Sequence, residues 1–180
     1  TGTYAAYLKS WDSRALKPMN LSLYEVIPSI TKNLAIKADA NDVVNKYDVD
    51  VLYLDPPYNS RQFASNYFLL ELIAEGWFNK KPEIYGLTGM RPYEKQKSFY
   101  CQSNKAATVL LDLITKARAK YILLSYNNEG IIPITKIREI LTTRGTVKEF
   151  SKAHKRYRAI NQDGSKIRTN ELLFLVEVNK

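Results

Sequence analysis

The feature that most constrains the fold is a hydrophobic run that stops at two prolines. Val49–Leu54 (VDVLYL) is rich in β-branched and aromatic residues, which favours a buried β-strand. Asp55-Pro56-Pro57-Tyr58 follows directly. Because proline has no N–H to donate to a β-ladder, the strand must end at this tetrapeptide. The sequence therefore places a stiff, carboxylate-bearing turn at one end of a buried strand.

The segments after this turn alternate between helical and strand patterns. Helices are predicted for residues 62–75, 104–119 and 133–143, and strands for residues 121–126, 146–150 and 171–178. Residues 76–98 read as a long loop, and a basic loop joins the last two strands. Pro133 opens the third helix and Gly145 ends it. This alternation predicts an α/β sheet that is mostly parallel and closes with an antiparallel hairpin.

The segment before the first buried strand is less regular. Residues 21–34 have helical character, although Pro28 interrupts the pattern. Residues 35–38 are predicted as a short strand, and residues 41–47 as a short helix with Asn41 as its cap.

Three polar side chains fall at the carboxyl ends of predicted strands. They are Asp39, Asp55 and Tyr126. Ligands of a parallel α/β sheet bind beyond these strand ends. We therefore expect that one site could use all three residues.

Composition and charge narrow the class of protein. The net charge is +9, and lysines and arginines displace counterions condensed on phosphates, so a polyanionic partner is favoured. No apolar run approaches the roughly 20 residues of a membrane span, and no signal-peptide pattern is present, so we expect a cytoplasmic protein without a membrane partner. Cys101 and His154 are the single residues of their types, which excludes a Cys/His zinc site and leaves no expected metal.

The tetrapeptide has the groups that methylation of a nucleobase amine requires. The exocyclic amine of adenine is a poor nucleophile, because its lone pair is delocalised into the ring. Two acceptors on its hydrogens localise that lone pair and stabilise the positive charge that grows during transfer. The Asp55 carboxylate and the Pro56 carbonyl can supply them, held in place by the rigid prolines. Tyr58 offers an aromatic face on which an extruded base can stack.

Several strings resemble one family, the D12 class of adenine-N6 DNA methyltransferases found in restriction–modification systems. The strings lie at residues 53–62 (YLDPPYNSRQ), 66–71 (NYFLLE), 121–130, 155–158, 4–9 and 38–41. The resemblance spans nearly the whole chain. It implies a class I S-adenosylmethionine-dependent methyltransferase with a Rossmann-like sheet, acting on adenine N6 in a specific sequence of double-stranded DNA.

The resemblance also implies roles for individual residues. Asp55, Pro56, Pro57 and Tyr58 form the catalytic motif, in which Asp55 and Pro56 hold the adenine amine and Tyr58 stacks on the base. Asp39, together with Asp55, contacts the cofactor S-adenosylmethionine. The implied DNA contacts come from a basic set, namely Arg61, Lys155, Arg156, Tyr157 and Arg158.

The chain departs from the family pattern in one respect. The glycine-rich Phe-x-Gly-x-Gly segment, which cradles the methionine part of the cofactor, is absent, as is the acidic residue that closes the second strand. We therefore expect residues 1–180 to form a single, partial catalytic domain without its N-terminal strands. Residues 1–34 would be a helical or DNA-facing segment. The expected partner is an N-terminal segment or second chain with the glycine-rich motif, and the strand before Asp55 should have an open edge.

Plainer interpretations of the same residues stay open. The tetrapeptide could be an ordinary strand-ending turn, Asp39 a helix cap, and residues 127–128 a simple turn. The basic set around Lys155 could be a solvated hairpin. We interpret His154 as a surface residue and Cys101 as a structural thiol. Cys101 does not follow a proline at a strand end, as the nucleophile of cytosine-C5 methyltransferases does.

Two alternative functions also stay open. Cytosine-N4 methyltransferases share this chemistry but more often have serine at the position of Asp55. The missing glycine-rich segment motivates the other alternative, a non-catalytic DNA-binding fragment or subunit.

Overall fold

The centre of the molecule is a mixed four-stranded sheet. The computed structural model describes residues 11, 13–18, 20, 22–76, 83–84, 91–160 and 166–179, without the side chains of residues 14, 15, 155–160, 166 and 167. The strands are Val49–Leu54 (β1), Ala119–Asn127 (β2), Gly145–Ile160 (β3) and Lys166–Val178 (β4), in the order β1-β2-β4-β3. β1 pairs with β2 in parallel, whereas β4 is antiparallel to both of its neighbours. The predicted hairpin is confirmed, but the described sheet is mixed rather than mostly parallel.

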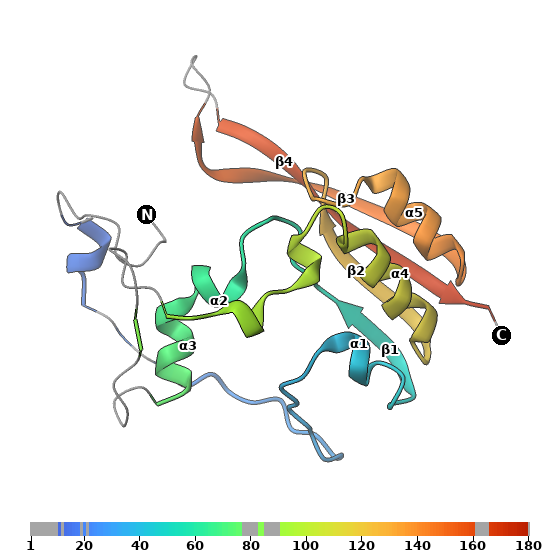
Figure 1. Ribbon diagram of the computed structural model, residues 1–180, viewed down its shortest axis with the longest axis horizontal. Helices are drawn as coiled ribbons and strands as arrows, with labels where there is room; N and C mark the ends of the chain where they lie inside the picture. The colour runs from blue at the N-terminus through green and yellow to red at the C-terminus, as the bar shows by residue number, and fades with distance from the viewer. Residues whose placement is uncertain are drawn as a thin grey trace.

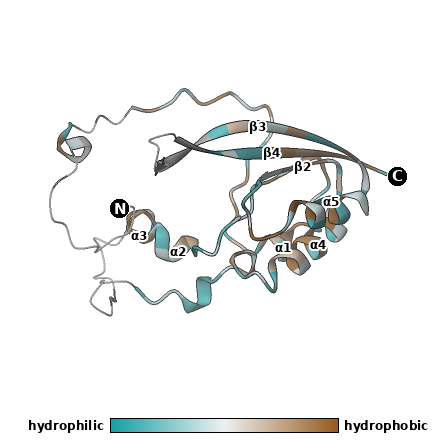
Figure 2. Cartoon of the chain, turned by 90° about the horizontal axis from the view of Figure 1, so that it is seen from above, coloured by the Kyte–Doolittle hydropathy of each residue, from teal (hydrophilic) through white to brown (hydrophobic). Residues whose placement is uncertain are grey.

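Two amphipathic helices cover one face of the sheet (Figure 2). They are Ala106–Lys116 (α4) and Ile134–Thr142 (α5). The core lies between them and the sheet, where successive strand residues point to alternate faces. Its fully buried members include Leu110, Ile114, Ile122, Leu124, Ile137, Leu141, Phe174 and Val176. No helix in the described segments is long and apolar enough to cross a membrane.

The opposite face of the sheet has exposed apolar side chains. Val51 and Tyr121 are cross-strand partners there, with 53% and 40% of their surface exposed, and Tyr53 is 59% exposed. β1 is an edge strand, and its outer edge pairs with no other strand among residues whose structure is described. The open edge expected from the sequence is therefore confirmed for these residues. Contiguous exposed apolar surface is typical of interaction sites.

The segment before β1 corrects two predictions. The described residues 22–34 form no helix, and residues 35–38 form no strand. Apolar side chains along this segment are fully exposed, as at Leu23 (102%) and Ile30 (106%). A short helix needs a face on which to pack, and a strand needs a hydrogen-bonded neighbour. The described part of the chain offers this segment neither, and Pro28 further opposes a helix.

Two helix boundaries also differ from the predictions. The helix Ala40–Val43 (α1) is capped by Asp39, whose Oδ1 accepts the Asn41 N–H at 2.9 Å, so the predicted cap Asn41 lies inside the helix. The single helix predicted for residues 62–75 is instead two helices, Phe63–Asn66 (α2) and Phe68–Ala74 (α3). They are separated by Tyr67, whose φ of −109° and ψ of 25° are not helical.

The C-terminal hairpin is longer than its sequence pattern indicates. β3 and β4 pair from Gly145 opposite Val178 as far as Lys155 opposite Arg168, and pairing resumes at Ile160 opposite Lys166. Most of the predicted basic loop is therefore β-ribbon. Figure 1 shows this ribbon, called the arm below (residues 151–160 and 166–170), projecting beyond the helices.

Gly145, predicted to end the third helix, instead begins β3 at a close backbone approach. A Cβ atom at this position would lie 1.9 Å from the carbonyl oxygen of Glu177, and a paired strand backbone cannot swing away. We expect Gly145→Ala to lower the free energy of unfolding by about 1–3 kcal/mol, measured by urea titration. Thr146→Ala, at the exposed neighbouring position, should change it by only about 0.5 kcal/mol. Equal stability of the two variants would contradict the close approach.

Candidate active site

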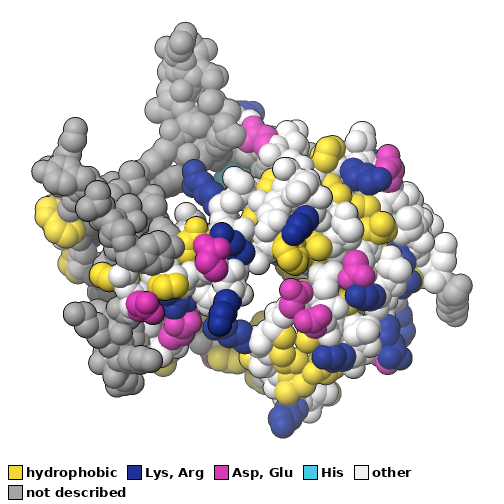
Figure 3. Space-filling view, viewed as in Figure 1, with side chains coloured by type: hydrophobic (Ala, Val, Ile, Leu, Met, Phe, Trp, Pro, Cys, Tyr) yellow, Lys and Arg dark blue, Asp and Glu magenta, His cyan; other side chains and the backbone are white. Residues whose placement is uncertain are grey.

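A cavity of about 660 Å³ lies at the carboxyl end of β1. Its volume falls within the roughly 300–1,000 Å³ of small-molecule sites. Its walls come from β1, the helices α1, α2, α3 and α4, and the segments 37–39, 55–57 and 95–100. They include Asp39, Leu54, Asp55, Pro56, Pro57, Phe63, Glu71, Ser98, Tyr100 and Leu110. Figure 3 shows the molecule hollowed in this region, with acidic and basic side chains around the opening.

Asp55 is the first residue after β1 and lines the cavity. The side chain is exposed, and its carboxylate has no hydrogen bond or ion pair to any described residue. Pro56 and Pro57 line the same cavity. An ionised carboxylate only accepts hydrogen bonds, so Asp55 is available to N–H or O–H donors of a ligand.

Asp39 lines the same cavity and also caps α1. Its Oδ1 accepts the backbone N–H of Asn41, while its Oδ2 accepts no hydrogen bond within the described chain. Capping therefore occupies one oxygen and leaves the other for a ligand. The cap interpretation of Asp39 is confirmed, and it is compatible with a role in ligand binding.

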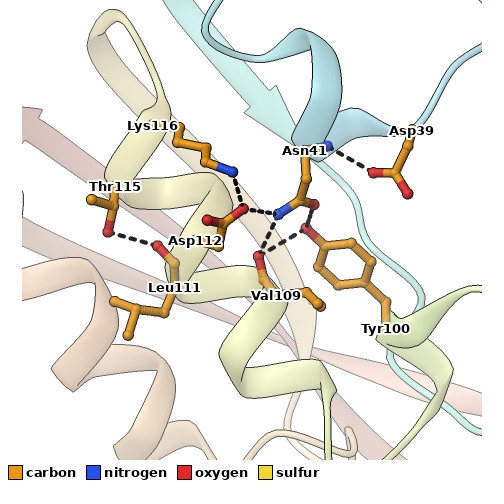
Figure 4. A network of polar contacts seen from close by, with 8 residues as sticks. All are labelled: Asp39, Asn41, Tyr100, Val109, Leu111, Asp112, Thr115 and Lys116. Carbon is orange, nitrogen blue, oxygen red and sulfur yellow. Dashed lines mark hydrogen bonds and ion pairs between the residues drawn. The ribbon is translucent and has the colours of Figure 1, made fainter.

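Asn41 holds the Asp39 corner of the cavity in place (Figure 4). Its Nδ2 donates to the Val109 carbonyl at 2.9 Å and to Asp112 Oδ2 at 2.8 Å, and its Oδ1 accepts the Tyr100 hydroxyl at 2.8 Å. Lys116 also donates to Asp112 Oδ2, at 2.8 Å. These contacts join α1, α4 and the 3₁₀ helix Phe99–Cys101 around the cavity.

The ionisation of two residues in this network follows from their surroundings. Hydrogen bonds from Lys116 and then Asn41 lower the pKa of Asp112, so this carboxylate stays charged at neutral pH. Burial, with smaller contributions from Asp39 and Asp112, raises the pKa of Tyr100, so its hydroxyl stays protonated and donates. Sequence analysis missed the role of Tyr100, because its partner is far away in the chain and only the fold brings the two together.

The wall segment 95–100 is anchored to residues that follow the Asp55–Tyr58 turn. Gln62 accepts the Ser98 N–H at 2.7 Å and donates Nε2 to the Ser98 carbonyl at 3.2 Å, pairing with the backbone as a neighbouring strand would. The Cys101 thiol donates to the Arg61 carbonyl at 3.3 Å. Burial raises the pKa of Cys101, which opposes formation of the reactive thiolate. These observations support the interpretation of Cys101 as structural.

Tyr58 directly follows Pro57 but is not itself part of the cavity wall, whereas Tyr126 lies in the core. Tyr58 is 39% exposed, and its ring meets that of Tyr126 edge-on, with the centroids 6.3 Å apart and the planes at 77°. Tyr126 is only 1% exposed and is not part of the cavity wall. The prediction that one site could use Asp39, Asp55 and Tyr126 is therefore wrong for Tyr126. The alternation of β2 turns this side chain toward α5 and the core.

The predicted DNA-contacting residues lie in two places. Arg61 is exposed shortly after the Asp55–Tyr58 turn. The backbone of residues 155–158 lies in β3 on the arm, and their side chains lie outside the described residues. His154, next to them, is exposed, in agreement with its interpretation as a surface residue.

A ligand-sized cavity at a strand end, beside an unpaired carboxylate on a rigid turn, defines a binding site of the α/β class. A model of the D12 class N6 adenine-specific DNA methyltransferases matches residues 1–140. The chain belongs to this family.

Three relatives are similar to nearly the whole chain. Type II methyltransferase M.FokI of Planomicrobium okeanokoites is 39% identical, over 98% of this chain and 27% of its own length. Modification methylase StsI of Streptococcus sanguinis is 38% identical, over 98% of this chain and 27% of its own length. Type II methyltransferase M.NlaIII of Neisseria lactamica is 36% identical, over 97% of this chain and 52% of its own length. The chain thus spans about a quarter to a half of these relatives, and no solved structure matches it significantly.

We expect the Tyr100 hydroxyl to stabilise the cavity wall. Tyr100→Phe removes the donor to Asn41 and should lower the free energy of unfolding by about 1–2 kcal/mol in a denaturant titration. Tyr47→Phe is the matched control, because this exposed hydroxyl makes no hydrogen bond to any described residue. A Tyr100→Phe protein as stable as the control would show that the network adds nothing to the fold.

Proposed function

We propose that this chain supplies the catalytic turn of a site-specific DNA methyltransferase that methylates adenine N6 with S-adenosylmethionine. One observation carries the proposal. Asp55, in a chain of this family, follows β1 with its carboxylate unpaired among the described residues, and it lines a cavity of ligand size.

The residues around the cavity fit the cofactor and the amine. S-adenosylmethionine, when bound, supplies an electrophilic methyl group. The free Oδ2 of Asp39 can accept hydrogen bonds from the donors of the cofactor. The Asp55 carboxylate and the Pro56 carbonyl accept from the adenine amine, so the lone pair of its nitrogen is localised toward the incoming methyl. Because the proline turn is rigid, these acceptors are in position before the reaction begins.

The DNA would meet the turn and the arm together. Tyr58 directly follows Pro57, which lines the cavity, and its exposed ring can stack on an adenine extruded from the duplex. Arg61 follows the turn, and Lys155, Arg156, Tyr157 and Arg158 belong to the projecting arm (Figure 1). Cations interleaved with an aromatic residue suit phosphates and an unstacked base. The net charge of +9 supports the same partner.

A second polypeptide segment would complete the cofactor site. The chain contains no Phe-x-Gly-x-Gly segment, and the relatives that it matches are longer. The open edge of β1 and the apolar face around Val51 and Tyr53 provide a surface for that segment. A segment that adds a strand to this edge would satisfy the unpaired backbone groups of β1 and bury the apolar face.

The role of Asp55 can be tested by mutation. Asp55→Ala in the complete enzyme should reduce methylation at least roughly 100- to 1,000-fold, because an acceptor that stabilises the developing charge is lost. Fold and DNA affinity should be retained. Mass analysis of nucleosides after incubation with DNA measures the product, and N4-methylcytosine in place of N6-methyladenine would identify the cytosine alternative.

Asp50→Ala is the matched control for this test. Asp50 lies on the same strand but pairs with Lys120 on the surface, at 2.6 Å, and such pairs add little stability. The control should keep near-normal turnover. Near-normal turnover of Asp55→Ala would remove Asp55 from the mechanism.

The completing segment can be tested by calorimetry and hydrogen exchange. We expect the 180 residues alone to show no heat of S-adenosylmethionine binding, and clear binding once the glycine-rich segment is added. The amides of β1 should become protected in the mixture, whereas those of α5, away from the open edge, should not change. Absence of cofactor binding in both states would favour the non-catalytic DNA-binding alternative.

A further inference from the structure

The loop after β2, residues 128–132, bends back onto the catalytic turn. The Ile131 N–H donates to the carbonyl of Tyr58 at 2.9 Å. This hydrogen bond fixes the backbone of the residue that would stack on the base. Nothing in the sequence spacing joins these two segments.

Tyr126 supports this loop from inside the protein. Its hydroxyl accepts the Ile132 N–H at 3.0 Å, and its ring lies edge-on against the ring of Tyr58. Gly130 lies directly on the Tyr126 ring, where a Cβ atom would come within 2.2 Å of Cε1. The buried Tyr126 side chain therefore positions both the loop and the Tyr58 ring.

The other side of the loop is fixed to the root of the arm. Asn128 donates its N–H to the Asn170 carbonyl at 3.1 Å, and its Oδ1 accepts the Asn170 N–H at 2.9 Å and the Thr169 hydroxyl at 2.8 Å. Asn127 donates Nδ2 to Glu171 at 2.9 Å. The loop thus connects the start of β4 with the catalytic turn through consecutive hydrogen bonds.

We propose that Tyr126 is a positioning residue for base stacking: through residues 130–132 it holds Tyr58 in register with the arm. The inference rests on the proposed function, since it assigns a purpose to the placement of Tyr58. Tyr126 is 1% exposed and absent from the cavity wall, so it acts through Tyr58 and not on the substrate. A displacement of about 1 Å in a group that orients a substrate can reduce the rate by roughly a hundredfold, so small losses of position matter.

Tyr126→Phe in the complete enzyme tests this role. The substitution removes only the acceptor for the Ile132 N–H and keeps the ring. We expect kcat on duplex DNA to fall roughly tenfold, with the KM for S-adenosylmethionine unchanged. The same measurement is made with the target adenine opposite a non-complementary base, which lowers the energy needed to extrude it. There the loss should shrink to about threefold or less, because less stacking is needed to hold the base out.

A merely structural role would give a different pattern. Loss of active protein reduces the rate equally on paired and mismatched DNA, so equal losses would overturn the inference, as would an unchanged kcat. Tyr93→Phe is the matched control, because its hydroxyl makes no hydrogen bond to any residue in the described segments, and it should show wild-type rates on both substrates.

A second variant and the wild type complete the test. If Tyr126→Phe fails to fold, Gly130→Ala is used instead. Its added methyl group displaces the loop from the Tyr126 ring while the Tyr126 hydroxyl is kept. This variant should also lose more rate on paired DNA than on mismatched DNA. A wild-type enzyme that methylates neither DNA would contradict the proposed function. An active wild-type enzyme together with a variant whose rate changes equally on paired and mismatched DNA, or does not change, would contradict only the role of Tyr126.

Discussion

Parallel hydrogen bonding between β1 and β2 is the constraint on which the rest of the site depends. Val51 pairs with Tyr121 and Leu54 with Leu124, so both strands run toward the same edge of the sheet, where β2 continues beyond β1 to Asn127. Since two prolines prevent β1 from continuing, Asp55 emerges beyond that edge on a rigid turn. The core formed by Leu124 and Phe174 then fixes the sheet beneath α4 and α5. Backbone pairing and apolar packing thus position the Asp55 carboxylate, which accepts no hydrogen bond from any described residue.

Polar networks define the space around that carboxylate. Asn41 joins α1, α4 and the segment of Tyr100, while Gln62 pairs with the backbone of Ser98. Both networks use amide side chains, which donate and accept at once and so connect two segments with one residue. A third group of hydrogen bonds, at Asn128, joins the loop after β2 to the arm. The turn beside the cavity and the arm are therefore connected through this loop.

The sequence predicted the elements that carry their own local pattern. The strands β1 and β2, the helices α4 and α5 and the C-terminal hairpin all match predictions from the sequence. The strand at residues 35–38 and the helix at residues 21–34 were predicted wrongly, since each depends on a neighbour that the described residues do not provide. Asp39 and Asp55 line one cavity as expected, whereas Tyr126, expected at the same site, is buried in the core. Strand ends are visible in a sequence, but the face to which a terminal side chain points depends on the pairing register.

By itself, the sequence determined where the chain must stop and turn. The prolines after Leu54 fixed a carboxylate at a strand end, and the strings around them fixed the family. Only the tertiary structure decided that Asp55 lies beside a cavity without a partner among the described residues, that Asn41 and Tyr100 hold the cavity wall, and that Tyr126 supports the turn from inside the protein. The physical reason is range. Proline stereochemistry and hydrophobic periodicity act over a few residues, whereas hydrogen bonds between distant segments exist only after the sheet has brought them together.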